Sequence, residues 1–204
     1  MPLQADGDAF HFLCEIPKWT RAKLEVAIDE VNNPLKQDAT KAGLPREYAH
    51  GDMLFNYGAL PQTWEDPSHR HPDTGCPGDN DPLDAVELGF RQLAVGAVVP
   101  VKVLGVLGMI DGGETDWKVL VLRTDDPLAA LVEDVDDLER ELPGAVHALR
   151  EWLRVYKVAE GKARNAFALG ERAMGAEYAR GVIAQTHASW RAKYGSLQRK
   201  AAKL

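Results

Sequence analysis

The sequence lacks long apolar runs and an excess of positive charge. No stretch approaches the roughly 20 consecutive apolar residues that a membrane-spanning helix needs. The amino-terminal segment MPLQADGDAFHF has neither the basic nor the apolar region of a secretory signal. A formal net charge of −7 disfavours nucleic acid or an anionic membrane as a partner held by bulk electrostatics. We therefore expect a cytoplasmic protein that binds neither nucleic acid nor a membrane.

Cysteine is also scarce. Cys14 and Cys76 are too few for a disulfide framework and fit a reducing compartment. Cys76 follows His69 and His71, but their spacing matches no usual zinc pattern, so we interpret this segment as a surface loop. The chain has no internal repeat and no linker long enough to separate domains. With 45% hydrophobic residues, it is predicted to form one domain over residues 1–204.

Alternating polar and apolar residues predict strands in the first part of the chain. In residues 14–28, Lys23 and Glu25 face one way and the apolar residues between them face the other. Residues 94–110 are β-branched and interrupted by glycine, and residues 116–122 follow a glycine-rich turn. We expect these segments to be strands of one antiparallel sheet or barrel.

The spacing of apolar residues becomes helical after Pro127. Pro143 stands near a helix start, as proline often does. The pattern therefore predicts a mainly β fold with flanking helices in its last third. The predicted helical segments are 134–141, as a short turn or helix, 143–157 and 171–194, and the predicted loops are 69–80 and 163–171.

The segment GDNDPLDAVEL gathers Asp79, Asp81 and Asp84 without a lysine or arginine among them. Like charges this close cost free energy unless a cation neutralises them. A calcium EF-hand loop does not fit, because Asp84 falls where that loop needs glycine. On this segment alone, an acidic surface turn is an equally good interpretation.

A second acidic segment, DGGETDWKVLV, strengthens the metal interpretation. Alternation along a strand places Asp116 and Lys118 on one face, as it does Lys23 and Glu25. Oxygen ligands without a cysteine and histidine set favour Mg²⁺ or Mn²⁺ over zinc. Lysines beside such a metal site suggest a phosphate ligand, because Mg²⁺ is commonly held by a few carboxylates together with substrate phosphates.

Five segments together resemble the soluble family I inorganic pyrophosphatases, in their fungal and animal form. They follow the family's order over roughly residues 10 to 195. The resemblance implies a closed, OB-like five-stranded β-barrel with C-terminal helices and a site at its mouth. It also implies an inorganic diphosphatase, which hydrolyses pyrophosphate to two orthophosphates by direct attack of a metal-activated water. The segments are EIPKWTRAKLEV, NYGALPQTWEDP, GDNDPLDAVEL, DGGETDWKVL and EWLRVYK.

The resemblance also implies roles for individual residues. Asp81 would be the catalytic base that takes a proton from the nucleophilic water, and Glu15 would support the site. Several Mg²⁺ ions would bind in each site, with Mn²⁺ as a substitute. The implied metal ligands are Asp79, Asp84, Asp116, Asp111 and Glu25, and the implied groups for pyrophosphate and phosphate are Lys23, Arg46, Tyr57, Lys118, Tyr156 and Lys157.

Simpler structural roles compete with some of these assignments. Tyr156 and Lys157 end a predicted helix, where a basic residue commonly interacts with the helix dipole. Lys23 and Glu25 would also suit a solvated strand face. In QTWEDP, Trp64 is interpreted as a packing or loop-anchoring residue, and its neighbour Asp66 as a capping residue.

The sequence departs from the family pattern at one position, and at another it matches a residue of a subunit interface. The family usually carries a tyrosine shortly before NYG, where this chain has Asp52 or Met53. Trp19 matches a subunit-contact position of dimeric members, so we expect a homodimer, with a hexamer as the alternative.

Two other functions fit parts of the pattern. A broader Mg²⁺-dependent phosphohydrolase would act on nucleotides or polyphosphate, but no motif suggests a pocket for a base. A non-catalytic OB-type module would need a basic, aromatic face for single-stranded nucleic acid. The predicted mouth is acidic, which counts against the second of these.

Overall fold

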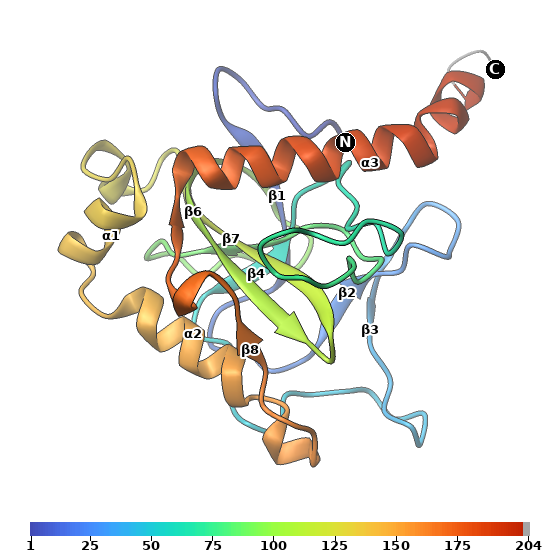
Figure 1. Ribbon diagram of the computed structural model, residues 1–204, viewed down its shortest axis with the longest axis horizontal. Coiled ribbons are helices and arrows are strands. Elements are labelled where there is room, and N and C mark those ends of the chain that lie inside the picture. Colours follow the sequence, from blue (N-terminus) through green and yellow to red (C-terminus); the bar gives the residue numbers. More distant parts are fainter. Residues whose placement is uncertain (202–204) are drawn as a thin grey trace.

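A closed ring of five strands forms the centre of the computed structural model (Figure 1). Strand β1 pairs with both β4 and β6, so the order β1-β4-β5-β7-β6 returns to its start and confirms the predicted closed arrangement. The model describes residues 1–201, with side chains for residues 1–195. The ring strands are β1 (Phe10–Ile16), β4 (Asn56–Ala59), β5 (Asp84–Glu87), β6 (Val98–Asp111) and β7 (Glu114–Arg123).

The prediction of an antiparallel sheet is wrong for one pair of strands. β5 and β7 run parallel, with Asp84 opposite Lys118, whereas the other neighbours in the ring are antiparallel. A ring with an odd number of strands cannot alternate in direction all the way round. Closure of five strands therefore requires a parallel pair, and here it brings an acidic residue beside a lysine.

The predicted strand over residues 14–28 is interrupted. β1 ends at Ile16, Pro17 offers no N–H for a strand ladder, and Trp19 has a φ of 63°. The chain then forms β2 (Leu24–Val26), which pairs with β3 (Leu35–Gln37) in a separate two-stranded sheet. This small sheet carries Lys23 and Glu25 beside the ring instead of within it.

Helices cover the outside of the strands. α1 (Val135–Glu141) confirms the short acidic helix, and α2 (Ala145–Val155) confirms the next one. α3 (Ala176–Ala201) starts five residues later than predicted, because β9 (Met174–Gly175) first pairs with β6. The predicted loop over residues 163–171 contains two short elements, residues 166–167 and 169–171. The remaining short elements are β8 (Ala166–Phe167) and the 3₁₀ helices η1 (Pro127–Ala130), η2 (Val158–Glu160) and η3 (Leu169–Glu171).

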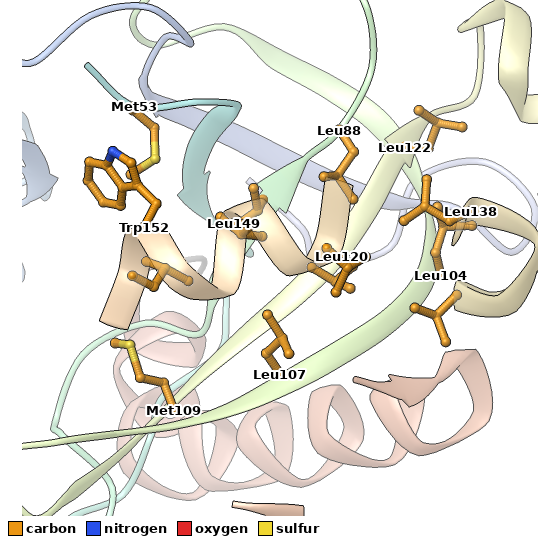
Figure 2. Close-up of a cluster of buried hydrophobic side chains, with 14 of the residues drawn as sticks. Met53, Leu88, Leu104, Leu107, Met109, Leu120, Leu122, Leu138, Leu149 and Trp152 are labelled. Atoms are coloured by element: carbon orange, nitrogen blue, oxygen red, sulfur yellow. The ribbon is translucent and has the colours of Figure 1, made fainter. Parts of the chain in front are cut away.

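Two apolar clusters use alternate residues of the strands. Leu120 of β7 belongs to a cluster with Leu149 and Trp152 of α2, and Figure 2 shows these side chains gathered between helix and sheet. Val119, the residue before it, packs instead in the cluster that includes Ile183 of α3. Burial on both faces fixes the register, since a shift by one residue would exchange the two sets.

The predicted domain of residues 1–204 includes residues 202–204, which lie outside the described part of the chain, so its full extent stays a prediction. Within residues 1–201, no helix has both the length and the apolar composition to cross a membrane.

Candidate active site

A cleft of about 890 Å³ lies where the ring meets the β2–β3 sheet. All of the site residues predicted above line this cleft except Lys118, whose side chain lies behind the wall and is 2% exposed. The predicted residues therefore come together although they are spread from Glu15 to Lys157 in the sequence. Neither Asp52 nor Met53 is among the lining residues: Met53 packs in the core and Asp52 pairs with Arg21.

Lys118 joins two of the predicted metal ligands at the base of the cleft. Its Nζ lies 2.5 Å from Asp84 Oδ2 and also forms an ion pair with Asp116. Tyr57 accepts a hydrogen bond from the same ammonium group at 2.9 Å and donates one to Asp84. Burial opposes the charged ammonium, but Asp116 and Asp84 outweigh burial and hold the pKa of Lys118 well above its usual value.

Three carboxylates form a compact group beside this lysine. Glu65, Asp79 and Asp116 each offer an oxygen, and these atoms lie within 4.8 Å of one another. Burial and the neighbouring acids raise the pKa of Asp79 to about 8. The pKa of Asp116 is raised to about 7, because burial and Asp84 raise it more than Lys118 lowers it. A cation bound to these carboxylates would favour their ionised form.

Glu65 is the member of this group that sequence reasoning missed. Its Oε1 accepts a hydrogen bond from the backbone N–H of Trp117 at 3.1 Å. Its Oε2 is buried and has no hydrogen-bond partner among the described residues. A buried oxygen without a partner is costly, and a hard cation held by carboxylate oxygens would supply one. The donor set therefore fits a divalent cation such as Mg²⁺.

Backbone contacts with Glu65 shape the acidic turn that precedes β5. Asn80 donates its N–H to Glu65 O at 2.9 Å, and Glu65 donates its own to Asp81 O at 2.9 Å. Gly78 passes so close that a Cβ there would lie 2.5 Å from Glu65 C. The turn is not extended, since Asn80 has a φ of 77° and β5 begins only at Asp84.

The turn separates the two aspartates on either side of Asn80. Asp79 joins Glu65 and Asp116, whereas Asp81 is outside that group and forms no ion pair among the described residues. Burial raises the pKa of Asp81 to about 6, with further contributions from Asp84 and Glu25. Asp81 therefore lies in the cleft apart from the compact carboxylate group.

Two predicted phosphate-binding lysines of the cleft are paired with acids. Lys23 pairs with Glu25 and lies 3.2 Å from Asp38, and Lys157 pairs with Asp111. These contacts unite predicted phosphate-binding lysines with predicted metal ligands. They exclude a merely solvated strand face for Lys23.

Arg46 is held between two carboxylates that the sequence did not reveal. Its guanidinium donates to Asp38 Oδ2 and to Glu160 Oε2, each at 2.8 Å. Glu160 is 114 positions away in the chain. No local motif marks Asp38 or Glu160, so this contact could not be found from periodicity or spacing.

Glu15 and Tyr156 stand at the edges of the cleft. Glu15 accepts a hydrogen bond from the N–H of Val26 at 3.1 Å, which links β1 to β2 and fits the predicted supporting role. Burial first, and then Asp84, raise the pKa of Glu15 well above its usual value. Tyr156 stacks on Trp152 with 5.1 Å between ring centres, and burial raises its pKa.

Trp64 and Asp66 have the structural roles that were predicted for them. Asp66 accepts hydrogen bonds from Ser68, as a capping residue does, and Trp64 anchors the acidic turn. The histidines at positions 69 and 71 and Cys76 do not form a metal-ligand group within the described residues. Trp19 is 63% exposed, so it is not a core residue.

The cleft combines a carboxylate group that could hold a cation with lysines and an arginine, a combination typical of metal-dependent phosphohydrolases. The chain belongs to the inorganic pyrophosphatase family, whose family model matches residues 12–191. The inorganic pyrophosphatase of Mus musculus is 46% identical over 195 residues, which make up 94% of this chain and 68% of the mouse protein.

Solved structures of the family have the same fold. The recombinant inorganic pyrophosphatase from T brucei brucei has a TM-score of 0.91 and 47% identity, covering 98% of this chain and 58% of that chain. A vacuolar soluble pyrophosphatase of Trypanosoma cruzi, truncated and in complex with PPi, has a TM-score of 0.89 and 46% identity, covering 98% and 73%. The predictions of the family and of a pyrophosphate hydrolase are confirmed, and metal-dependent hydrolysis of pyrophosphate is the general function of this family.

Proposed function

We propose that this cleft hydrolyses pyrophosphate to two orthophosphates with Mg²⁺ as its natural cation and Mn²⁺ as a substitute. The observation that carries the proposal is the compact group of Glu65, Asp79 and Asp116, in which Oε2 of Glu65 is buried without a hydrogen-bond partner among the described residues. Lysines and an arginine surround this group, so one site offers ligands for hard cations and for phosphate oxygens.

The acids of the cleft would hold the cations. Asp79, Asp84 and Asp116 are the proposed ligands at the base, where Glu65 joins them. Glu25 and Asp111 are the proposed ligands nearer the substrate. When bound, divalent cations neutralise charge and lower the pKa of water toward neutrality.

Asp81 is proposed to accept the proton of the attacking water. It lines the cleft and has no lysine or arginine partner among the described residues, so its carboxylate is available to a water molecule. A positioned carboxylate of this kind contributes by general base catalysis. The backbone contacts of the turn hold it in place beside the cation ligands.

The cationic and phenolic groups are proposed to bind the two phosphates. Lys23 and Lys157 pair with Glu25 and Asp111, two proposed cation ligands, so a cation bound to these acids would free both lysines for phosphate oxygens. Arg46 lines the same cleft, held by Asp38 and Glu160. Tyr57 and Tyr156 add hydroxyl groups to the wall. Lys118 would act from behind the wall by holding Asp84 and Asp116, and Glu15 would support β2.

A homodimer is the proposed assembly, supported by the exposed indole of Trp19, with a hexamer as the alternative. Sedimentation or light scattering of the protein and of a Trp19→Ala variant tests this proposal. A wild-type monomer at micromolar concentration would contradict it. The cytoplasmic location stays a prediction from the sequence.

The deciding experiment measures phosphate release from pyrophosphate, ATP and tripolyphosphate with Mg²⁺, with Mn²⁺ and with EDTA. We expect rapid release from pyrophosphate, dependence on the cation, and little release from ATP. Absence of release from pyrophosphate with Mg²⁺ would refute the proposal. Equal rates on ATP would instead favour a broader phosphohydrolase.

A further inference from the structure

The far end of α3 reaches the acidic turn through one lysine. Lys193 Nζ lies 3.5 Å from the centre of the Trp64 indole and 3.4 Å from Asn80 Oδ1. Trp64 completes the triangle, since its Nε1 lies 3.1 Å from both O and Oδ1 of Asn80. The side chains of Lys193 and Trp64 therefore both contact Asn80, the residue between Asp79 and Asp81.

The same helix holds the segment that carries Trp64. Thr186 O accepts the backbone N–H of Trp64 at 3.1 Å, and His187 Nδ1 lies 2.7 Å from Gln62 O. Residue 193 lies seven positions after Thr186, so both project from one helix face. In Figure 1, the second half of α3 passes beside the loop between β4 and β5. The helix therefore contacts both the segment that carries Trp64 and, through Lys193, the turn at Asn80.

Asn80 needs such support. Its φ of 77° places it in the left-handed region, which asparagine tolerates better than most residues but which is not its lowest-energy conformation. This conformation directs Asp79 toward Glu65 and Asp116 and leaves Asp81 on the cleft wall. Contacts that hold Asn80 therefore set the separation of the two carboxylates.

We propose that Lys193 and Trp64 are positioning residues that hold Asn80 and thereby set the geometry of Asp79 and Asp81. The inference deepens the proposed function and rests on its cation site. It assigns a role to the end of α3, which none of the implied site residues occupies. Neither side chain needs to touch pyrophosphate for this role.

Cation affinity separates this role from two others that Lys193 could have. Removal of a positive charge near a carboxylate cluster strengthens cation binding if Lys193 acts only through its charge. A lysine that binds substrate would raise KM for pyrophosphate without weakening cation binding. If Lys193 is a positioning residue, its loss weakens cation binding, because the cation ligands are then less well held.

The first measurement is the calorimetric affinity of Mn²⁺, without substrate, for the wild type and for Lys193→Met, Lys193→Arg and Trp64→Phe. We expect about 3- to 10-fold weaker binding for Lys193→Met and Trp64→Phe, and nearly full rescue in Lys193→Arg. Arg180→Met is the matched control, since Arg180 is exposed on α3 and forms no ion pair or hydrogen bond within the described residues. Unchanged or stronger binding in Lys193→Met would overturn the proposal.

The second measurement does not depend on the cation or on the proposed activity. Hydrogen exchange of the cation-free protein should be faster in the peptide containing Asn80 when Lys193 is replaced by methionine, with exchange in β6 and β7 unchanged. The Trp64→Phe and Lys193→Met effects should be less than additive, because both act on one residue. Wild-type exchange around Asn80, or additive effects, would contradict positioning even if pyrophosphate were not the substrate.

Discussion

Lys118 Nζ lies 2.5 Å from Asp84 Oδ2, across the parallel pair formed by β5 and β7. The two residues are register partners in the parallel pair of the ring. The lysine is almost fully buried and also pairs with Asp116. It therefore compensates two acids at the base of the cleft before any cation binds.

Replacement of Lys118 by methionine should destabilise the cation-free protein by about 3–5 kcal/mol, since it leaves buried acids without their counter-charge. Addition of Mn²⁺ should recover part of this loss. Urea denaturation with and without Mn²⁺ measures both effects. Lys102→Met is a control, because its partner Glu133 is largely exposed, and it should cost less than about 1 kcal/mol. An equal loss of unfolding free energy in the two variants would show that the buried ion pair stabilises the protein no more than the exposed one.

Asp81→Asn should lower kcat on pyrophosphate by about 10²- to 10⁴-fold, the usual range for loss of a general base. The affinity for Mn²⁺ should change little, because Asp81 lies outside the carboxylate group at the base. Asp66→Asn, in the neighbouring loop, is the matched control and should retain activity. Normal turnover by a folded Asp81→Asn protein would exclude the general-base role.

Glu65→Gln should weaken Mn²⁺ binding by about 10-fold, a typical effect of altering a group in or next to a metal shell. The substitution retains an oxygen to accept from the N–H of Trp117 but replaces a carboxylate that can bind a cation by a neutral amide. Because burial already raises the pKa of Glu65 well above its usual value, the neutral amide should cost the cation-free protein little stability to urea while the cation affinity falls. A variant with unchanged affinity in calorimetry would place Glu65 outside the cation site.

Gly78→Ala should destabilise the protein by about 1–3 kcal/mol and reduce activity, because the added Cβ would overlap the backbone of Glu65. Gly181→Ala is the opposite case. A Cβ at Gly181 meets no atom within 4 Å, and alanine is the better helix former by about 1 kcal/mol. Urea midpoints should thus move in opposite directions. A harmless Gly78→Ala substitution would mean that the turn can move away from Glu65.

Cys14 should not react with a thiol reagent in the native protein, even at pH 9. Its side chain is fully buried, and burial, with Glu15 and Glu87, raises its pKa to about 12, so the folded state disfavours the reactive thiolate. Cys76 is partly exposed and should react. Titration with a chromogenic disulfide should count one thiol in buffer and two in denaturant. A Cys14→Ser variant identifies the slow thiol, and two fast thiols in buffer would contradict the burial.

Much of the site was predictable because its spacing is local. Asp116 and Lys118 stand two residues apart in a strand, so they share a face in any sheet that contains them, and the ion pair confirms it. The clustering of Asp79, Asp81 and Asp84 indicated a cation site only together with the second acidic segment, because an acidic surface turn would also explain the first. Their exact arrangement was not predictable, because the turn depends on the backbone of Glu65.

The sequence by itself determined the acidic segments, their lysine neighbours, the change from strand to helix near residue 127 and the resemblance to a family. Only the tertiary structure decided that β5 and β7 are parallel, that Glu65 joins Asp79 and Asp116, and that Glu160 holds Arg46. The physical reason is the range of the contacts. Strand alternation follows from a few neighbouring residues, whereas these pairings appear only after the ring of strands closes and brings distant segments to one cleft.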